Sequence, residues 1–136
     1  MPFDKRKMGS MDNCATSEEL YRQLDEEFHF TFDPCPLNPP GLREFDGLGE
    51  WGERNFVNPP YSDKKPWIRK AIEQKKKGKL TVMLLPVDTS TSWFHDLILP
   101  HADEIRFIRG RLKFKPCGQP TKYASMIVIF KPETKR

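Results

Sequence analysis

Apolar residues recur at helical spacing in separate stretches of the chain, which predicts several amphipathic helices. The first helix is expected after Thr16, a suitable N-cap, because Glu19 three residues later completes a capping box. A second helix is expected to begin at Asp63 as its cap and to end at Gly78, and a shorter one covers residues 93–98. The expected buried side chains of these helices are Leu20, Tyr21, Leu24 and Phe28, then Trp67, Ile68, Ala71 and Ile72, then Trp93.

Shorter apolar runs predict the strands. The run over residues 80–85 is nearly continuous, which is typical of a strand buried on both faces. The other strands are expected at residues 30–32, 54–57, 104–108, 112–115 and 126–130. Because strands alternate with helices, the sequence predicts a mostly parallel α/β sheet with helices on both faces and an antiparallel end. Residues 1–13 are polar and non-periodic, so a flexible tail is expected before a single domain over residues 14–136.

Polar or proline-rich segments follow several of these strands and are candidates for a binding site. They are Asp33-Pro34, the tetrapeptide Asn58-Pro59-Pro60-Tyr61, and the loop over residues 86–93. Ligands of open α/β sheets bind at the carboxyl ends of the strands, so these segments are expected around one site. Asp88, inside the last segment, suits a loop-capping role and a substrate-side role equally.

Composition narrows the function classes only slightly. The 136 residues suffice for one domain, and a net charge of +4 with a pI of about 9.0 favours a polyanionic partner. No apolar run approaches the ~20 residues of a membrane span and no apolar segment follows the basic N-terminus, so a cytoplasmic protein is expected. Cys14, Cys35 and Cys117 have long, irregular gaps, which favours free thiols over disulfides or a zinc site. The lysines at 75–77 are expected to form a solvated helix end that attracts phosphate.

The tetrapeptide Asn58-Pro59-Pro60-Tyr61 has the groups needed to hold a planar amine for attack on a methyl group. The side-chain oxygen of Asn58 and the backbone carbonyl of Pro59 can each accept one N–H of the amine. Both hydrogen bonds strengthen as positive charge grows on the nitrogen, and the prolines keep the acceptors in place. The ring of Tyr61 offers a stacking face for a planar base, worth ~1–3 kcal/mol. No strong general base is required, because the nitrogen becomes acidic once it is alkylated.

A second Asn-Pro-Pro sequence, at residues 38–41, shows how much depends on context. It ends in glycine, lacks the aromatic ring and follows no apolar strand, so a turn is expected there. The closely spaced glycines at residues 47–52 follow no apolar strand, so the chain has no Gly-x-Gly loop of the usual dinucleotide type. The tetrapeptide at residues 58–61 therefore carries the candidate chemistry.

Basic residues alternate along the expected strand near residue 112. They are Arg109, Arg111, Lys113 and Lys115. Alternation in a strand places these side chains on one face, so they are candidates for contact with nucleic-acid phosphates.

Several motifs occur in a fixed order between residues 13 and 130. They are Thr16, Phe32-Asp33-Pro34-Cys35, Asp46-Gly47-Leu48, Trp51, Asn58 to Ser62, Trp67, Leu85-Pro86, Thr89 to Phe94 and Gly110 to Phe114. With these motifs in this order, the chain resembles the small phage-type DNA N-6-adenine methyltransferases, a family also found in prophages. The similarity extends over nearly the whole expected domain.

The resemblance implies a compact Rossmann-like class I methyltransferase fold, S-adenosyl-methionine as methyl donor and adenine in DNA as acceptor. The residues that carry over as catalytic and base-holding are Asn58, Pro59, Pro60 and Tyr61. Those that carry over to the cofactor side are Thr16, Asp33, Pro34 and Asp46. The candidates for contact with DNA are Arg109, Arg111 and Lys113.

Two alternatives stay open from the residues alone. One is a methyltransferase that acts on another planar amine, such as an RNA base or a glutamine amide. The other is a non-catalytic nucleic-acid-binding relic of the fold, which the short chain and the missing glycine loop favour. The leading prediction is a DNA adenine methyltransferase of the host cytoplasm, a monomer or weak dimer, with no metal and no membrane partner.

Overall fold

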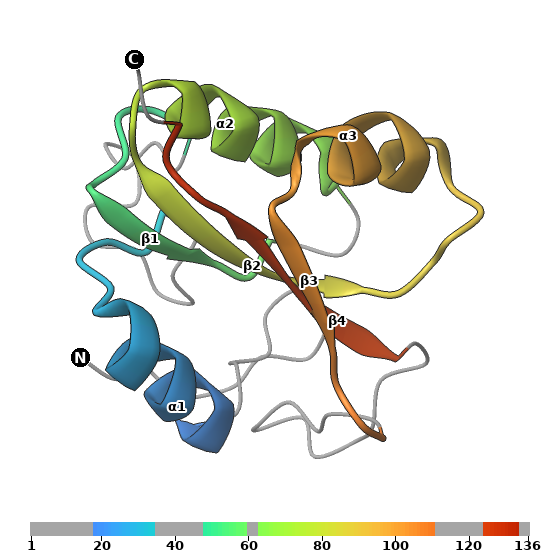
Figure 1. Ribbon diagram of the computed structural model, residues 1–136, viewed down its shortest axis with the longest axis horizontal. Coiled ribbons are helices and arrows are strands. Elements are labelled where there is room, and N and C mark those ends of the chain that lie inside the picture. The colour runs from blue at the N-terminus through green and yellow to red at the C-terminus, as the bar shows by residue number, and fades with distance from the viewer. Residues whose placement is uncertain (1–17, 35–47, 60–62, 111–123, 134–136) are drawn as a thin grey trace.

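The computed structural model describes residues 18–34, 48–59, 63–110 and 124–133, and the structural statements below concern these residues (Figure 1). Along the chain the elements are α1 (Glu18–Phe28), β1 (Arg54–Val57), α2 (Lys65–Lys76), β2 (Leu80–Pro86), the π-helical turn η2 (Phe94–Ile98), α3 (Leu99–His101), β3 (Glu104–Phe107) and β4 (Ser125–Phe130). None of the described helices is long and apolar enough to cross a membrane. The expected tail at 1–13, the expected strand at 112–115 and all three cysteines lie outside the described residues.

The strands form a mixed sheet in the order β1-β2-β4-β3. Strands β1 and β2 are parallel, whereas β4 is antiparallel to both of its neighbours, β2 and β3. The prediction of a mostly parallel sheet is therefore wrong. The physical reason is the place of β4, which lies inside the sheet and makes antiparallel ladders along both of its sides. Strand alternation along the sequence does not reveal this insertion.

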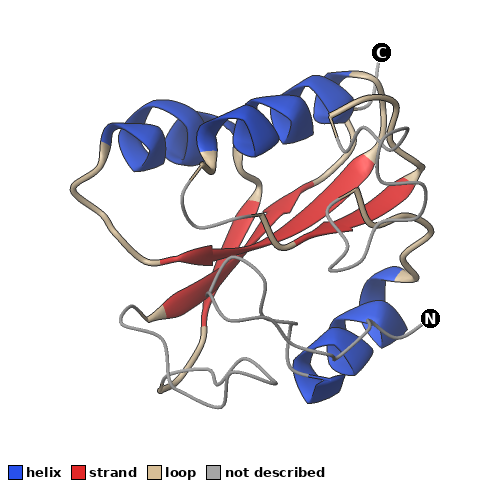
Figure 2. Cartoon of the chain, turned by 180° about the vertical axis from the view of Figure 1, so that it is seen from behind, coloured by secondary structure: helices blue, strands red, loops and turns tan. Residues whose placement is uncertain are grey.

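Helices cover both faces of the sheet, as predicted, and divide the core into two layers (Figures 1 and 2). On one face α1 packs through Leu24 and Phe28 against alternate residues of the strands, among them Phe56 and Val82. The other face is covered by α2 and η2. Their buried residues here are Ile68, Ala71, Ile72, Phe94 and Ile98, with Trp93 just before η2. The predicted apolar faces of the first two helices and the burial of Trp93 are thus confirmed.

Helix α2 ends as the sequence predicts but begins differently. At its C-terminus the N–H of Gly78 donates to Lys75 O and the N–H of Lys79 donates to Gln74 O, both at 3.0 Å. This pair of hydrogen bonds requires a residue in the left-handed backbone conformation, and Gly78 has φ 87°. The prediction that Asp63 caps this helix is wrong. The N-cap is Lys64, and it makes no side-chain capping hydrogen bond. Pro66 occupies the first turn instead, where its missing N–H costs nothing.

The expected strand at residues 30–32 is reduced to one bridge, between Phe32 and Asn55, which runs parallel to β1. The Phe32 N–H donates to Arg54 O and the Phe56 N–H donates to Phe32 O, both at 3.1 Å. Close approach of the two segments depends on Gly52, where a Cβ atom would lie 2.8 Å from Phe32 Cβ. The bridge is short but fixes the direction in which the chain enters Asp33.

Candidate active site at the carboxyl end of the sheet

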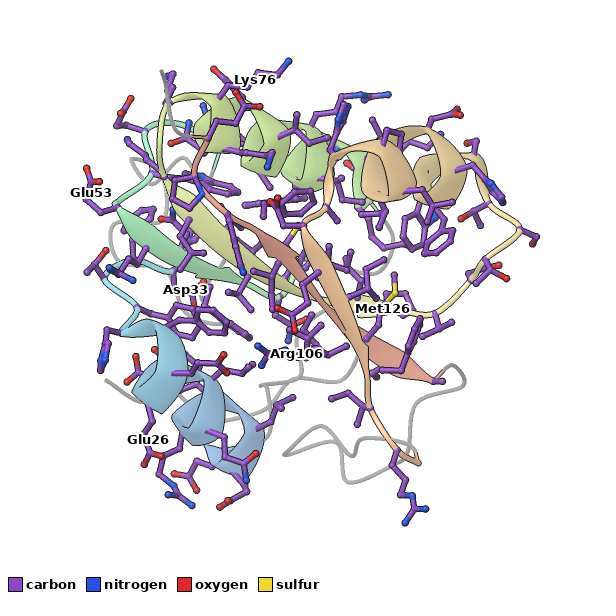
Figure 3. All side chains as sticks on the ribbon, in the orientation of Figure 1. Glu26, Asp33, Glu53, Lys76, Arg106 and Met126 are labelled. Carbon is purple, nitrogen blue, oxygen red and sulfur yellow. The ribbon has the colours of Figure 1, made fainter. Side chains whose placement is uncertain are left out.

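One end of the sheet brings together most of the predicted site segments that the structure describes. Strands β1, β2 and β3 all end here and β4 begins here, because β1 is parallel to β2 and β4 is antiparallel to both β2 and β3. This carboxyl end lies near Met126 in Figure 3, whereas Glu53 and Lys76 mark the opposite, amino end. The parallel bridge at Phe32 points Asp33 in the same direction as β1. The expected convergence of the strand ends is confirmed for these segments.

Asn58 and Pro59 leave the sheet directly from β1. The preceding Phe56 and Val57 are fully buried, which fixes the strand end in the core. Asn58 is partly exposed and Pro59 is buried. Pro60 and Tyr61 lie outside the described residues. Asn58 thus stands at the boundary between core and solvent.

The chain after this loop is tied to the segment that follows β2. Lys64, the N-cap of α2, places its Nζ 5.5 Å from the centre of the Trp93 ring. Trp93 is buried in the core beneath α2. Cation–π contacts of this kind contribute about 0.5–1 kcal/mol or more when partly desolvated. The contact therefore holds the start of α2, which follows the Asn58-Pro59 loop, against the segment that follows β2.

The loop after β2 is held by its own hydrogen bonds. The Val87 N–H donates to Ala124 O at 2.7 Å, which ties the loop to the start of β4. Asp88 accepts from the Ser90 hydroxyl at 3.2 Å through Oδ1 and from the Thr91 hydroxyl at 2.8 Å through its carbonyl. These bonds match the loop-capping role that was one of the two options for Asp88, and its substrate-side role stays a prediction.

Asp33 and Pro34 lie at this end of the sheet on the side of α1. Pro34 is buried, and Asp33 is partly exposed with its Oδ2 atom buried. Tyr21 of α1 packs edge-on against Phe56, with ring centroids 5.3 Å apart. Burial raises the pKa of Tyr21 to about 12, and the negative charges of Asp25 and Asp33 add to the effect. The charge of the Asp33 carboxylate is therefore felt at the hydroxyl of Tyr21 in α1. Thr16 and Asp46, the other predicted cofactor residues, lie outside the described part of the chain.

The end of β3 adds an aromatic ring and a cation to the same end of the sheet. Phe107 is 64% exposed, and Arg109, two residues later, is also exposed. Gly110 then turns the chain with φ 73°. Arg111 and Lys113, the other predicted DNA contacts, fall outside the described residues. Of the predicted basic group, the structure therefore places Arg109 at the carboxyl end.

Two features of this site were missed by the sequence analysis. Phe107 was assigned to a strand without any indication that its ring is exposed, and only the Arg-Gly that follows hinted at a surface turn. The Lys64–Trp93 contact joins residues far apart in the chain, and no local pattern reveals it. Sequence periodicity identifies which residues a strand contains, but not which of their side chains remain exposed in the sheet.

The described residues also limit other kinds of site. They contain no group of three or more His, Cys, Asp or Glu side chains that could hold a metal ion. A pocket of about 480 Å³ lies between Phe28, Arg54, Leu80 and Lys131. It opens at the amino end of the sheet, away from Asn58, and is therefore separate from the predicted catalytic loop.

Comparison with known proteins supports the motif analysis. Residues 5–136 match the family described as DNA N-6-adenine-methyltransferase (Dam). A DNA N-6-adenine-methyltransferase of Haemophilus phage HP1 (strain HP1c1) is 38% identical over 150 residues, covering 98% of this chain and 86% of that protein. One of Escherichia phage T1 is 48% identical over 64 residues, covering 46% of this chain and 26% of that protein. No solved structure matches the chain significantly. By this match over nearly its whole length, the chain belongs to the DNA N-6-adenine-methyltransferase (Dam) family.

Proposed function

We propose that the protein transfers a methyl group from S-adenosyl-methionine to the N6 amino group of adenine in DNA. The observation that carries this proposal is the position of Asn58-Pro59. It follows a fully buried strand, at the end of the sheet where Asp33 and the loop after β2 also emerge. An amide for the base and a carboxylate for a cofactor at neighbouring strand ends suit such a transfer, because ligands of open α/β sheets bind at the carboxyl ends of the strands. A Rossmann-like arrangement of the complete chain is part of the same proposal.

Asn58 and Pro59 hold the exocyclic amine of adenine in this proposal. The Asn58 side-chain oxygen accepts one N–H and the Pro59 carbonyl accepts the other. These acceptors gain strength as the nitrogen becomes positive, so they stabilise the transition state more than the bound substrate. After transfer the alkylated nitrogen releases a proton to solvent. Pro60 restricts the backbone, and Tyr61 stacks on the base after the base has left the duplex.

The residues on the α1 side suit a nucleoside cofactor with a charged amine. Asp33 offers a carboxylate with one buried oxygen, which can accept hydrogen bonds from an amine or from ribose hydroxyls. Tyr21 and the buried Pro34 provide apolar surface beside it. S-adenosyl-methionine, when bound, supplies the electrophilic methyl group. We assign Thr16 and Asp46 to the same cofactor on the strength of the motif pattern.

Contact with the DNA backbone is assigned to Arg109, Arg111 and Lys113. Arg109 is exposed at the carboxyl end and forms no salt bridge with any residue that the structure describes. An unpaired guanidinium is free to bind a phosphate, in contrast to cations already neutralised by carboxylates. The protein then acts where DNA is present, which for a phage-encoded protein is the host cytoplasm.

The test is methyl transfer by Asn58→Ala and by a matched variant in the second Asn-Pro-Pro sequence, Asn38→Ala. We expect Asn58→Ala to lose on the order of 10²–10³-fold in kcat, because one acceptor for the amine is gone. Asn38→Ala should retain wild-type activity. Circular dichroism should show that Asn58→Ala stays folded, since Asn58 is partly exposed at the end of β1. Full activity in Asn58→Ala would remove the central claim.

The same assay separates the other candidate activities. Methylated product is digested, and the modified nucleoside or amino acid is identified. N6-methyladenosine from RNA or a methylated glutamine would replace the proposed acceptor. Calorimetric titration with S-adenosyl-methionine tests the relic alternative, because a non-catalytic relic need not bind the donor.

A further inference from the structure

We propose that Phe107 is a DNA-contacting residue that stacks into the duplex beside the displaced adenine and fills the space that the base leaves. This inference rests on the proposed function, because it assigns a further residue to the same reaction. The partner is double-stranded DNA, and the group contacted is the base stack next to the target.

The exposure of Phe107 is the first observation. Phe107 and Ile105 lie on the same face of β3, because side chains alternate along a strand. Ile105 packs against the core cluster under α2 and η2, whereas the Phe107 side chain remains 64% exposed. Its partner in register is Met126, which is fully buried and is labelled in Figure 3. The backbone of Phe107 is thus held in the sheet while its ring faces solvent.

The position of Phe107 is the second observation. Strand β3 runs in the same direction as β1 and β2, since β4 is antiparallel to both β2 and β3 and β1 is parallel to β2. Phe107, the last residue of β3, therefore lies at the same end of the sheet as Asn58. Leu99, another exposed large apolar residue, precedes the start of β3 and belongs to the amino end. The exposed ring of Phe107 therefore lies at the end of the sheet where the proposed function places the duplex.

Charge around Phe107 favours a polyanion rather than an apolar protein partner. Arg109 follows two residues later, just past the end of β3, and forms no salt bridge with any described residue. Arg106 is on the opposite face and is already paired, with both carboxylate oxygens of Glu27 at 2.7 Å. An exposed ring next to an unpaired guanidinium suits a ligand that has both stacked bases and phosphates.

The support of Phe107 is rigid, which an inserted ring requires. The Ile108 N–H donates to Ser125 O at 2.9 Å, which continues the ladder one residue past β3. Arg106 links β3 to α1 through Glu27 and lies 5.6 Å from the Phe28 ring centre (Figure 3). Displacing a paired base costs free energy, and stacking on an aromatic side chain offsets part of that cost. Because the backbone at Phe107 is held in the sheet, only the ring itself has to be fixed when it stacks, which limits the entropy lost on binding.

The experiment compares Phe107→Ala on two duplexes that differ only opposite the target adenine. One is fully paired, and the other has an abasic position opposite the adenine, so that the base is already unpaired. On the paired duplex we expect kcat/KM of Phe107→Ala to fall about tenfold to hundredfold. On the abasic duplex the variant should come within about threefold of wild type. Phe107→Trp, which keeps a stacking ring, should retain activity on both substrates.

A second readout follows the base directly. With 2-aminopurine at the target position, wild type should raise the fluorescence on binding and Phe107→Ala should raise it much less. Leu99→Ala is the matched control, because Leu99 is 51% exposed but lies at the amino end of the sheet. It should behave as wild type in both assays.

The outcomes separate the two proposals. Equal losses on the paired and abasic duplexes, or no loss on either, would overturn the role of Phe107 while leaving the proposed function intact. A wild-type protein that methylates no adenine in either duplex would instead overturn the proposed function. Thermal unfolding of Phe107→Ala is expected to match wild type, since little of this side chain is buried.

Discussion

Asn55 and Asn58 stand three residues apart near the two ends of β1 and have different surroundings. Asn55 is fully buried. Its amide nitrogen donates to Gly52 O and to Leu80 O, and its oxygen accepts from the Gly52 N–H, all at 2.9 Å. Asn58 is partly exposed at the carboxyl end. The same residue type closes the structure at one end of the strand and, in the proposed reaction, holds the substrate amine at the other.

Charged residues follow the same division. At the amino end Lys75 binds Asp103 at 2.7 Å, and Lys79 binds Glu50 at 2.9 Å. Both lysines are largely buried by their neighbours, with 14% of each side chain exposed. The expectation that the lysines at 75–77 form a solvated helix end is therefore wrong for Lys75. At the carboxyl end Arg109 stays exposed. One end of the sheet uses its polar groups for stability, and the proposed function assigns those of the other end to binding.

The largest effect should come from Asn55→Ala. This change leaves the Gly52 N–H and the Leu80 carbonyl without their side-chain partner inside the core. We expect the free energy of unfolding to fall by about 3 kcal/mol, as for other unsatisfied buried groups. Denaturant unfolding measures it, with Asn58→Ala as control. If Asn58→Ala proved the more destabilising of the two, the division between the ends of β1 would be wrong.

A smaller, pH-dependent effect is expected from Asp103→Asn. Burial raises the pKa of Asp103, but hydrogen bonds from Lys75 and from the Lys131 N–H outweigh it and leave the pKa below 3.8. The carboxylate therefore stabilises the fold by up to about 1 kcal/mol at pH values above 3.8, and this contribution is lost as the pH falls through the lowered pKa. The difference between wild type and variant should thus be largest near neutral pH and vanish in acid.

The measurement is urea unfolding at several pH values. Asp96→Asn serves as control, because Asp96 is exposed and forms no salt bridge with any described residue. This variant should have a free energy of unfolding close to that of the wild type. A pH-independent loss in Asp103→Asn would mean that shape, not charge, accounts for its contribution.

The smallest effect is expected from Arg109→Gln in DNA binding. Loss of one phosphate contact should reduce the slope of log K against log salt concentration by about 0.9 and weaken binding several-fold. Lys76→Gln removes the same charge from an exposed position at the amino end and should leave the slope unchanged (Figure 3). Equal slopes for the two variants would show that the two ends of the sheet do not differ in their contribution to DNA binding.

Much of the local structure could be predicted because it depends on neighbours in sequence. The apolar stripe of α1, the face of α2 with Ile68 and Ala71, and the continuous run of β2 all formed as expected. One error arose where distant residues meet: the strand expected at 30–32 is a single bridge at Phe32, where Gly52 allows close approach to β1. The other error is local, since Lys64 rather than its neighbour Asp63 is the N-cap of α2 and makes no side-chain capping hydrogen bond.

The candidate site was predictable in part for the same reason. Asn58-Pro59 is recognisable as a motif next to a buried strand, and the family match confirms the resemblance that the ordered motifs carry. Phe107 was not recognisable, because its exposure depends on which strand lies beside β3. Its partner Met126 comes from a strand that the chain forms 18 residues later.

By itself the sequence determined the helices and strands, the polar strand ends and the family, because each depends on residue type, spacing and order. Only the tertiary structure decided that β4 enters between β2 and β3 and runs against both. That insertion gives β3 the direction of β1 and β2, so Phe107 and Arg109 emerge at the end of the sheet that holds Asn58. Pairing between strands distant in sequence is selected by the burial of both faces at once, which no local pattern encodes.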